Sequence, residues 1–268
     1  MKTINPSELS PMQVQMILQT AVAPRPIALA STIDKNGNVN LSPFSFFNLF
    51  SSNPPILIFS PARRVRDHST KDTLHNVLEV PEVVIGNVNF DMVQQVSLSS
   101  TEYETGVDEF IKSGLTKKPS ELVKPPLIAE SPVNFECKVI KVKPLGNEGG
   151  AGNLVICEVL KIHIREEFLN EEGNLDQKKL DLVSRLGGNW YGRTTAETLF
   201  EVPKPLVTKG IGFDQLPSEI RNSKIFTGND LGMLANVEQL PEGNFSADEN
   251  LHLEAQKLLL EGKIEEAW

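Results

Sequence analysis

The chain has 268 residues, 40% of them hydrophobic, which is enough for a folded core and argues against extensive disorder. It carries 26 Lys and Arg residues against 35 Asp and Glu residues, and this net charge of −9 disfavours the basic surface of a nucleic-acid-binding protein. No apolar run approaches the roughly 20 residues that cross a bilayer, and the opening MKTINPSELS lacks the apolar segment of a signal peptide. We therefore expect a cytoplasmic protein that makes no contact with membranes.

The first elements along the chain are predicted to be a helix and a β-hairpin. Ser10 is suited to cap the helix, with Pro11 at its first position. Apolar residues then recur at helical spacing, at Val14, Ile17 and Leu18. Between residues 27 and 41 the residues alternate in polarity on both sides of the sequence DKNG. This pattern predicts two antiparallel strands joined by a turn at Asn36 and Gly37.

The middle of the chain has the patterns of short strands and brief helices. PPILIFSP and EVVIGNV predict strands, DMVQQVSLSS predicts a helix, and KDTLHNVLEV predicts a brief helix opened by Asp72 or Thr73. Two longer strands follow in SPVNFECKVIKVKPL and GNLVICEVLKIHI, with alternate residues on opposite faces. The glycine-rich link GNEGGAGN lacks the spacing of a phosphate-binding loop and precedes a strand, so it predicts a hairpin turn.

These elements indicate the fold class and two domains. Short strands with hairpin turns dominate residues 25–165, which favours a mainly β protein with a closed antiparallel barrel over a doubly wound parallel sheet. From about Glu201 the chain becomes rich in Pro and Gly and ends in a charged helical pattern. We expect a barrel domain over residues 1–200 and a C-terminal extension over residues 201–268 that drapes over it.

The cysteines and histidines do not predict a metal site. Cys137 and Cys157 lie within apolar strand patterns, where we expect two small buried side chains in a reducing cytosol. A disulfide or zinc site is the alternative. The four histidines do not have the spacing of metal ligands either.

The order of several motifs resembles a known family. PRPIALASTIDKNGNVNLSPFSFFN is followed by NPPILIFSP, KDT, FECKVIKV, GNLVICEVLKIHI and SRLGGNWYG. This series, over roughly residues 20–195, is similar to the flavin reductase-like family with the FMN-binding split barrel, in its flavoredoxin-type branch. The resemblance implies a six-stranded antiparallel Greek-key barrel with flanking helices. It also implies a homodimer that holds FMN at the subunit boundary, and NADH or NADPH as electron donor.

FMN needs a flat apolar surface, hydrogen bonds at the edge of its ring, and a cationic pocket for its phosphate. Aromatic residues Phe44 and Phe46 are predicted to cover the ring, while Ser45 and Asn48 address its polar atoms. The resemblance adds two hydroxyls that face the ring or the ribityl chain, those of Ser31 and Thr32.

The phosphate site is predicted in SPARRVRDHSTKDT, the densest basic stretch of this acidic chain. Lys71 and Thr73 match the family's KDT motif, and would supply a charge and a hydroxyl beside a helix start. Asp72 is expected to cap that helix or to position Lys71. Arg63 is a further candidate for the phosphate. Each of Arg63, Arg64 and Arg66 could instead be solvated or attract a nucleotide donor.

The late motif RLGGNWYG leaves two interpretations open. Tyr191 could lean on the flavin or the donor, or it could seal a dimer contact together with Trp190. Arg25 in the sequence PRP also matches the family, and an ion pair is the structural alternative for it.

The leading functional hypothesis is an FMN-dependent oxidoreductase that takes hydride from NADH or NADPH. No side chain needs to act as acid or base in that step, so no catalytic residue is predicted. The alternative is an FMN-containing electron carrier or flavin-binding protein without nicotinamide activity of its own. A serine hydrolase is disfavoured, because no GxSxG motif is present to orient Ser45 or Ser69.

Overall fold

The computed structural model describes all residues 1–268, and the chain forms two compact units. The first unit spans Met1–Leu199 and the second spans Phe200–Trp268. No helix in either unit has the length and apolar character needed to span a bilayer.

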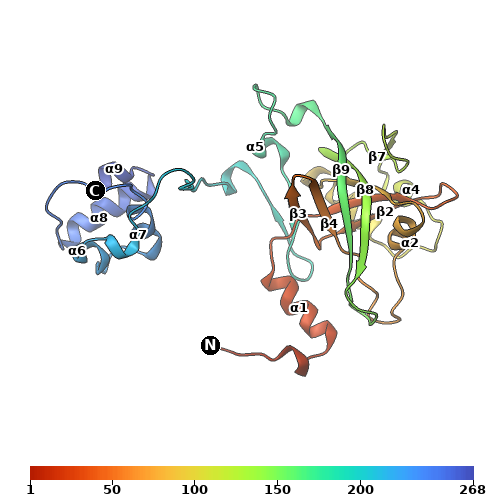
Figure 1. Ribbon diagram of the computed structural model, residues 1–268, viewed down its shortest axis with the longest axis horizontal. Coiled ribbons are helices and arrows are strands. Elements are labelled where there is room, and N and C mark those ends of the chain that lie inside the picture. The colour runs from red at the N-terminus through yellow and green to blue at the C-terminus, as the bar shows by residue number, and fades with distance from the viewer. The chain divides into compact units, whose positions relative to one another are not determined.

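The first unit is built on one antiparallel sheet of seven strands (Figure 1). The strands lie in the order β2-β1-β5-β8-β9-β4-β3. Their bounds in chain order are β1 (Ala28–Ile33), β2 (Val39–Phe44), β3 (Phe47–Ser52), β4 (Pro55–Phe59), β5 (Glu82–Gly86), β8 (Val133–Pro144) and β9 (Asn153–Ile164). Two small sheets pair β6 (Lys117–Lys118) with β7 (Leu127–Ile128) and β10 (Val183–Arg185) with β11 (Tyr191–Arg193).

The two edge strands of the main sheet are consecutive in the chain. Only Ser45 and Phe46 separate β2 from β3, although these strands lie at opposite ends of the strand order. The chain therefore bends at Ser45 and Phe46 and brings the two edges together, as in a barrel. The same bend divides residues 39–52 into two strands, so the sheet has seven strands where six were expected. The mainly β barrel fold itself is confirmed.

Two of the predicted turns are confirmed. β1 and β2 form a hairpin in which Gly37 has a φ of +85°, and the carboxylate of Asp34 accepts hydrogen bonds from the N–H groups of Asn36 and Asn38. β8 and β9 form the long hairpin of Figure 1, and the glycine-rich sequence is its turn.

The first unit contains five α-helices. They are α1 (Pro11–Ala21), α2 (Asp72–Glu79), α3 (Val93–Ser99), α4 (Glu109–Ser113) and α5 (Gln177–Leu180), with short 3-10 helices at Pro6–Glu8, Phe90–Met92, Glu166–Phe168 and Ala196–Thr198. The expected cap of α1 is confirmed, because Ser10 and Gln13 form a capping box. The brief helix α2 is confirmed and begins at Asp72, one of its two expected first residues. Asp72 does not cap it, because Lys71 occupies the N-cap position, without a side-chain hydrogen bond.

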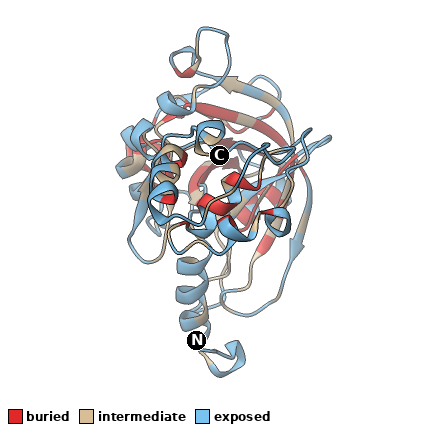
Figure 2. Cartoon of the chain, turned by 90° about the vertical axis from the view of Figure 1, so that its left-hand side faces the viewer, coloured by how far each residue is buried: buried red, intermediate tan, exposed pale blue.

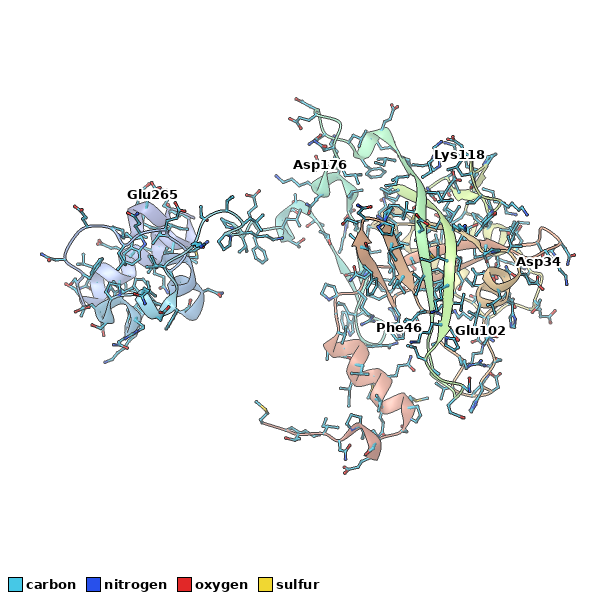
Figure 3. All side chains as sticks on the ribbon, viewed as in Figure 1. Asp34, Phe46, Glu102, Lys118, Asp176 and Glu265 are labelled. Atoms are coloured by element: carbon cyan, nitrogen blue, oxygen red, sulfur yellow. The ribbon has the colours of Figure 1, made fainter.

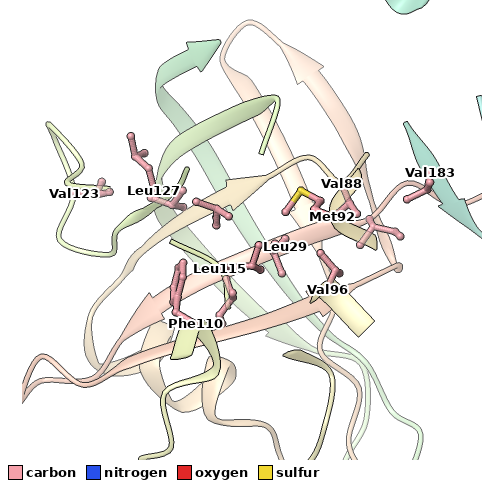
Figure 4. Packing of buried hydrophobic residues seen from close by; sticks show 13 residues of the cluster. Leu29, Val88, Met92, Val96, Phe110, Leu115, Val123, Leu127 and Val183 are labelled. Carbon is pink, nitrogen blue, oxygen red and sulfur yellow. The ribbon is translucent and has the colours of Figure 1, made fainter. Parts of the chain in front are cut away.

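The core explains why β1 is buried along its whole length. Ala28 and Ala30 face one hydrophobic cluster inside the barrel, whereas Leu29 faces a second cluster. The second cluster lies under the helices, and Figure 4 shows Leu29 packed near Met92, Val96 and Phe110. Cys137 and Cys157 belong to the first cluster as free thiols, and burial raises the pKa of Cys137 to about 12.

A buried carboxylate fixes the segment before β7. Glu136 on β8 is fully buried, and its carboxylate accepts hydrogen bonds from the backbone N–H groups of Glu121, Leu122 and Val123 at 2.6–3.0 Å. His163 on β9 lies 2.6 Å from the same carboxylate. Burial alone would raise the pKa of Glu136, but these partners outweigh it and the pKa is lowered below 4.5.

The second unit is helical and has its own hydrophobic core. Its helices are α6 (Ser218–Arg221), α7 (Gly228–Leu234), α8 (Glu249–Leu260) and α9 (Ile264–Ala267), after a 3-10 helix at Phe213–Gln215. Leu216, Phe226, Leu234 and Leu259 form its core, and His252 is buried with a hydrogen bond to Ser223. The charged C-terminal helix was expected; the separate core was not.

Candidate functional site

A cavity of about 740 Å³ lies between α1, the bend at Phe46 and the basic segment that follows β4. Its volume is within the range of cofactor and substrate pockets. Three of the ten residues predicted to bind the cofactor line it: Phe46, Arg63 and Lys71. Figure 3 labels Phe46 at the bend between β2 and β3. None of the residues that line the cavity is acidic, and four are cationic (Arg25, Arg63, Arg64 and Lys71).

One wall of the cavity is apolar and belongs to α1. The helix contributes Val14 and Leu18 to this wall. Leu9, which precedes the helix in the chain, and Val22, which follows it, also line the cavity. No residue of α1 is buried, and Figure 2 shows the helix as exposed along nearly all of its length. An isolated helix of 11 residues is marginally stable in water, so this wall gains stability when its apolar face is covered.

Arg25 fixes the C-terminal end of α1. Its guanidinium donates hydrogen bonds to the carbonyl oxygens of Gln19, Val22 and Leu186, the last at 2.9 Å. Gly187 allows the loop after β10 to approach α1, because a Cβ built there would lie 2.2 Å from Oγ1 of Thr20. Arg25 therefore makes hydrogen bonds to backbone carbonyls rather than the ion pair that was the alternative from the sequence.

Nε of Arg25 is buried without a partner beside the cavity, and Arg63 likewise has unused hydrogen-bonding capacity. Its Nη1 donates to the carbonyl oxygen of His68 at 3.1 Å, while its Nε is buried without a partner. A buried donor that lacks a partner costs free energy, and an anionic ligand in the adjoining cavity would remove that cost.

Arg64 and Arg66 are already engaged. Arg64 donates hydrogen bonds to the carboxylate of Glu102 and to Ser69 and Thr70, each at 2.9–3.1 Å. Arg66 is largely exposed and pairs with the other oxygen of Glu102 at 2.9 Å. These two arginines tie the basic segment to the loop after α3, so among the three arginines the geometry favours Arg63 for a ligand.

Lys71 lies between the large cavity and a small polar one of about 30 Å³. Its ammonium group donates to Oγ of Ser42 at 3.4 Å and lies 5.3 Å from the ring centre of Phe44. Burial, followed by the positive charge of Arg64, lowers the pKa of Lys71 below 10.5. One weak hydrogen bond leaves most of its donor capacity free for an anion.

Two predicted residues lie behind the cavity wall. Phe44 is buried in the barrel core with its ring 5.2 Å from that of Phe59, so it does not present a face to this cavity. Thr73 is fully buried, and its hydroxyl accepts a hydrogen bond from Asn40 at 3.0 Å. It borders only the small polar cavity.

Four further predicted residues, Ser31, Thr32, Ser45 and Asn48, do not line this cavity. Ser31 and Thr32 are fully buried in β1; the hydroxyl of Ser31 has no partner, and that of Thr32 accepts from Asn76. Ser45 lies in the bend and does not line the cavity, and the amide oxygen of Asn48 accepts from the N–H of Leu49 on exposed β3.

Tyr191 lies at a different place from the other predicted residues. It is on β11 with the guanidinium of Arg185 at 4.5 Å from its ring centre, and it borders a separate cavity of about 190 Å³. The two interpretations of Tyr191 drawn from the sequence both remain predictions.

Sequence reasoning missed the wall formed by α1 and the glycines at the tip of the β8–β9 hairpin. The helical spacing of Val14 and Leu18 was visible, but nothing in the sequence says which surface this apolar face meets. Gly149 and Gly150 line the cavity because the hairpin tip lies against the basic segment. Together the apolar wall and the cationic side suit a flat apolar molecule that carries an anionic group.

Comparisons with known proteins identify the family of this chain. Residues 21–181 match the family described as the flavin reductase like domain. An uncharacterized protein of Aquifex aeolicus is 37% identical over 68% of this chain and 90% of its own length. One from Halalkalibacterium halodurans is 38% identical over 77% of this chain and 98% of its own length.

Solved structures show the same fold. Nitrilotriacetate monooxygenase component B from Bacillus cereus has a TM-score of 0.70 at 28% identity, covering 75% of this chain and 98% of its own. The 2-nitrobenzoate 2-nitroreductase of Pseudomonas fluorescens has a TM-score of 0.67 at 28% identity, over 78% and 100%. Flavoredoxin of Desulfovibrio vulgaris shares the fold at 21% identity, with a TM-score of 0.57 over 69% and 93%. The family match covers most of the first unit, and this chain belongs to the flavin reductase like domain family.

Proposed function

We propose that this protein is an FMN-dependent oxidoreductase that takes hydride from NADH or NADPH and passes the electrons to an acceptor. The observation that carries the proposal is the cavity beside Phe46, with an apolar wall on one side and Arg63 and Lys71 on the other. Family membership supports flavin-related redox chemistry. Two solved relatives at 28% identity, a monooxygenase component and a nitroreductase, support an oxidoreductase.

The residues present fit FMN as a ligand. The exposed ring of Phe46 and the side chains of Val14 and Leu18 offer apolar surface to a planar ring system. Arg63 has a buried Nε without a partner, and Lys71 has free donor capacity, which suits a phosphate. The cavity of about 740 Å³ is large enough for a cofactor of this size.

The protein's own contribution is binding, orientation and the exclusion of water. When bound, the flavin supplies the hydride-accepting and electron-donating chemistry. Arg63 and Lys71 would hold the anionic end of the ligand, and Phe46 would offer apolar surface to its ring. Leu18 and Val14 remove water from the apolar side. Such orientation lowers the barrier because a hydride donor must be held about 3–3.5 Å from its acceptor.

The charge of the cavity also favours the proposed donor. Reduced nicotinamide nucleotides carry phosphates, and a cavity with four cationic side chains and no acidic one attracts them, although the whole chain is acidic. This argument does not distinguish NADH from NADPH, because both carry the pyrophosphate.

The proposal is tested by removing bound flavin, adding FMN, and following the oxidation of NADH and NADPH with oxygen or free flavin as acceptor. We expect FMN to bind and at least one nucleotide to be oxidised over many turnovers. If FMN binds and neither nucleotide is oxidised, the protein is an electron carrier or flavin-binding protein instead. If the visible spectrum shows no bound FMN at any concentration tested, the proposal is wrong.

We further propose that the protein acts as a homodimer. Large apolar side chains are exposed on β3, β9 and α1, namely Leu49, Phe50, Ile162, Met12 and Met16. Leu49 and Phe50 are neighbours on the edge strand β3, and a second copy that covers this edge would bury them. A second copy that covers β3 would also approach the bend at Phe46, and would then complete the flavin site.

The dimer is tested with a charge placed on β3. We expect Phe50→Lys to shift the protein from dimer to monomer in analytical ultracentrifugation and to lower its flavin content. The matched control is Leu78→Lys, because Leu78 is equally exposed on α2, away from β3. A monomeric unaltered protein, or equal effects of both substitutions, would contradict this proposal.

A further inference from the structure

The tip of the β8–β9 hairpin lies against the segment that carries Arg63. The N–H of Arg63 donates to the carbonyl oxygen of Ala151 at 2.9 Å, and its carbonyl oxygen accepts from the N–H of Gly150 at 3.0 Å. Asn153 adds hydrogen bonds from its backbone and its side chain to the carbonyl oxygen of Pro61, at 3.1 and 3.0 Å. The backbone of Arg63 is therefore held by the hairpin tip through both of its polar groups.

Gly149 makes this contact possible. A Cβ built at Gly149 would lie 2.8 Å from both Cα and the carbonyl oxygen of Val65, and 3.1 Å from the carbonyl oxygen of Arg64. All three are backbone atoms, which cannot move aside as a flexible side chain can. A larger residue at position 149 would therefore displace the tip, the segment 63–65, or both.

No other contact of the hairpin tip requires a glycine at position 149. Nδ1 of His68 lies 3.3 Å from the carboxylate of Glu148, but both side chains are largely exposed, and such surface contacts contribute little. Gly150 has a φ of +87°, which is a requirement of the turn itself. Gly149 has no such requirement, because its φ lies outside the left-handed region. What distinguishes it is the close approach to Val65.

We propose that Gly149 is a positioning residue for anion binding: it lets the hairpin tip hold Arg63 so that the guanidinium reaches the phosphate of the flavin. This inference rests on the proposed function, because it assigns the phosphate to Arg63. It gives the glycine-rich turn a role in the site through its contact with the segment that carries Arg63.

The experiment compares the affinities of Gly149→Ala for FMN and for riboflavin, which has the same ring and ribityl chain but no phosphate. We expect the dissociation constant for FMN to rise about tenfold, since a charge-assisted hydrogen bond is worth at least that factor, and that for riboflavin to stay unchanged. The control is Gly232→Ala in α7, where nothing lies within 4 Å of a built Cβ. We expect that variant to bind both flavins as the unaltered protein does.

A double variant tests whether Gly149 acts through Arg63. Arg63→Met alone should weaken FMN binding by about 10- to 100-fold. We expect Gly149→Ala combined with Arg63→Met to bind FMN no more weakly than Arg63→Met alone, because the contact that Gly149 positions is already lost. Additive losses would show that Gly149 acts by another route, and would overturn the inference.

The outcomes separate this inference from the proposed function. If the unaltered protein does not bind FMN, the proposed function fails. If it binds FMN and Arg63→Met weakens binding, but Gly149→Ala does not, only this inference fails. Equal losses for FMN and riboflavin in Gly149→Ala would also overturn it. Should Gly149→Ala not fold, Asn153→Ala loosens the same segment without adding volume, and it should show the same FMN-selective loss.

Discussion

Replacement of Lys71 by methionine is expected to weaken FMN binding by about 10- to 100-fold and to leave riboflavin binding unchanged. The ammonium group borders the cavity and has one weak hydrogen bond of 3.4 Å, to Ser42. Loss of a charge-assisted contact to phosphate costs about 1.5–3 kcal/mol. Methionine keeps much of the aliphatic stem, so packing against Phe44 is largely preserved. The measurement is a fluorescence titration with each flavin.

The same lysine predicts a pH dependence of FMN affinity. Burial, followed by the charge of Arg64, lowers the pKa of Lys71 below 10.5, so the side chain loses its charge at a lower pH than an exposed lysine does. FMN affinity should therefore fall as the pH rises through this lowered pKa, and Lys71→Met should lack that fall. Riboflavin titrated in parallel corrects for ionisation of the flavin ring.

The matched control is Arg66→Met, which removes a charge from the same basic stretch. Arg66 is exposed, pairs with Asp67 and Glu102, and does not line the cavity. We expect the affinity of Arg66→Met for FMN to stay within about twofold of that of the unaltered protein, since an exposed ion pair contributes little. If both variants lose the same affinity, the basic stretch acts through its general field, and the assignment of Lys71 to the phosphate is wrong.

Replacement of Glu136 by alanine is expected to lower the free energy of unfolding of the first unit by about 3–5 kcal/mol, the cost of breaking a buried, paired charge. The carboxylate is fully buried and accepts hydrogen bonds from three backbone N–H groups, besides its contact with His163. Alanine leaves these partners buried without an acceptor. Denaturant unfolding followed by circular dichroism measures the change.

The stabilisation by Glu136 has a defined pH range. Its pKa in the folded protein is lowered below 4.5, because the hydrogen bonds outweigh the effect of burial. A lowered pKa gives stability that is fully present above the unfolded value of about 4.3 and is lost as the pH falls through the folded value. The difference between the unaltered protein and Glu136→Ala should therefore shrink below about pH 4.3.

Glu121→Gln serves as the control for this prediction. Glu121 pairs with Lys161 at the surface, and its side chain is mostly exposed. We expect its unfolding midpoint to stay close to that of the unaltered protein. If Glu136→Ala unfolds at the same denaturant concentration as the unaltered protein, the carboxylate does not fix the segment 121–123.

Much of the local structure could be predicted because it depends on neighbouring residues. The capping box of α1 and the turn at Gly37 need only short-range hydrogen bonds and a positive φ, which the residue types reveal. The motif order identified the family, and the ordered hairpins indicated the barrel. Six strands were expected and seven are present, because the bend at Ser45 and Phe46 that divides residues 39–52 depends on how the sheet closes.

The candidate site was predicted less completely, because its residues meet only through long-range packing. Phe44 and Phe46 are two positions apart and share a sequence context, yet Phe44 lies in the core and Phe46 at the cavity. Arg63, Arg64 and Arg66 look alike in the sequence. Only the structure shows that Arg64 and Arg66 pair with Glu102, whereas Nε of Arg63 has no partner. A sequence shows that these side chains are basic or aromatic, but not which of them is already paired.

The sequence by itself determined the barrel, the family and the flavin-related chemistry, because repeated polarity patterns and the order of motifs can be read directly along the chain. Only the tertiary structure decided that α1 forms a wall of the cavity, that Gly149 touches the backbone of Val65, and that residues 200–268 have a separate core. The first two depend on segments far apart in the chain that meet at van der Waals distance, and the third depends on how the short helices of residues 200–268 pack on one another. The polarity pattern of a single element shows neither, because both depend on complementary shape.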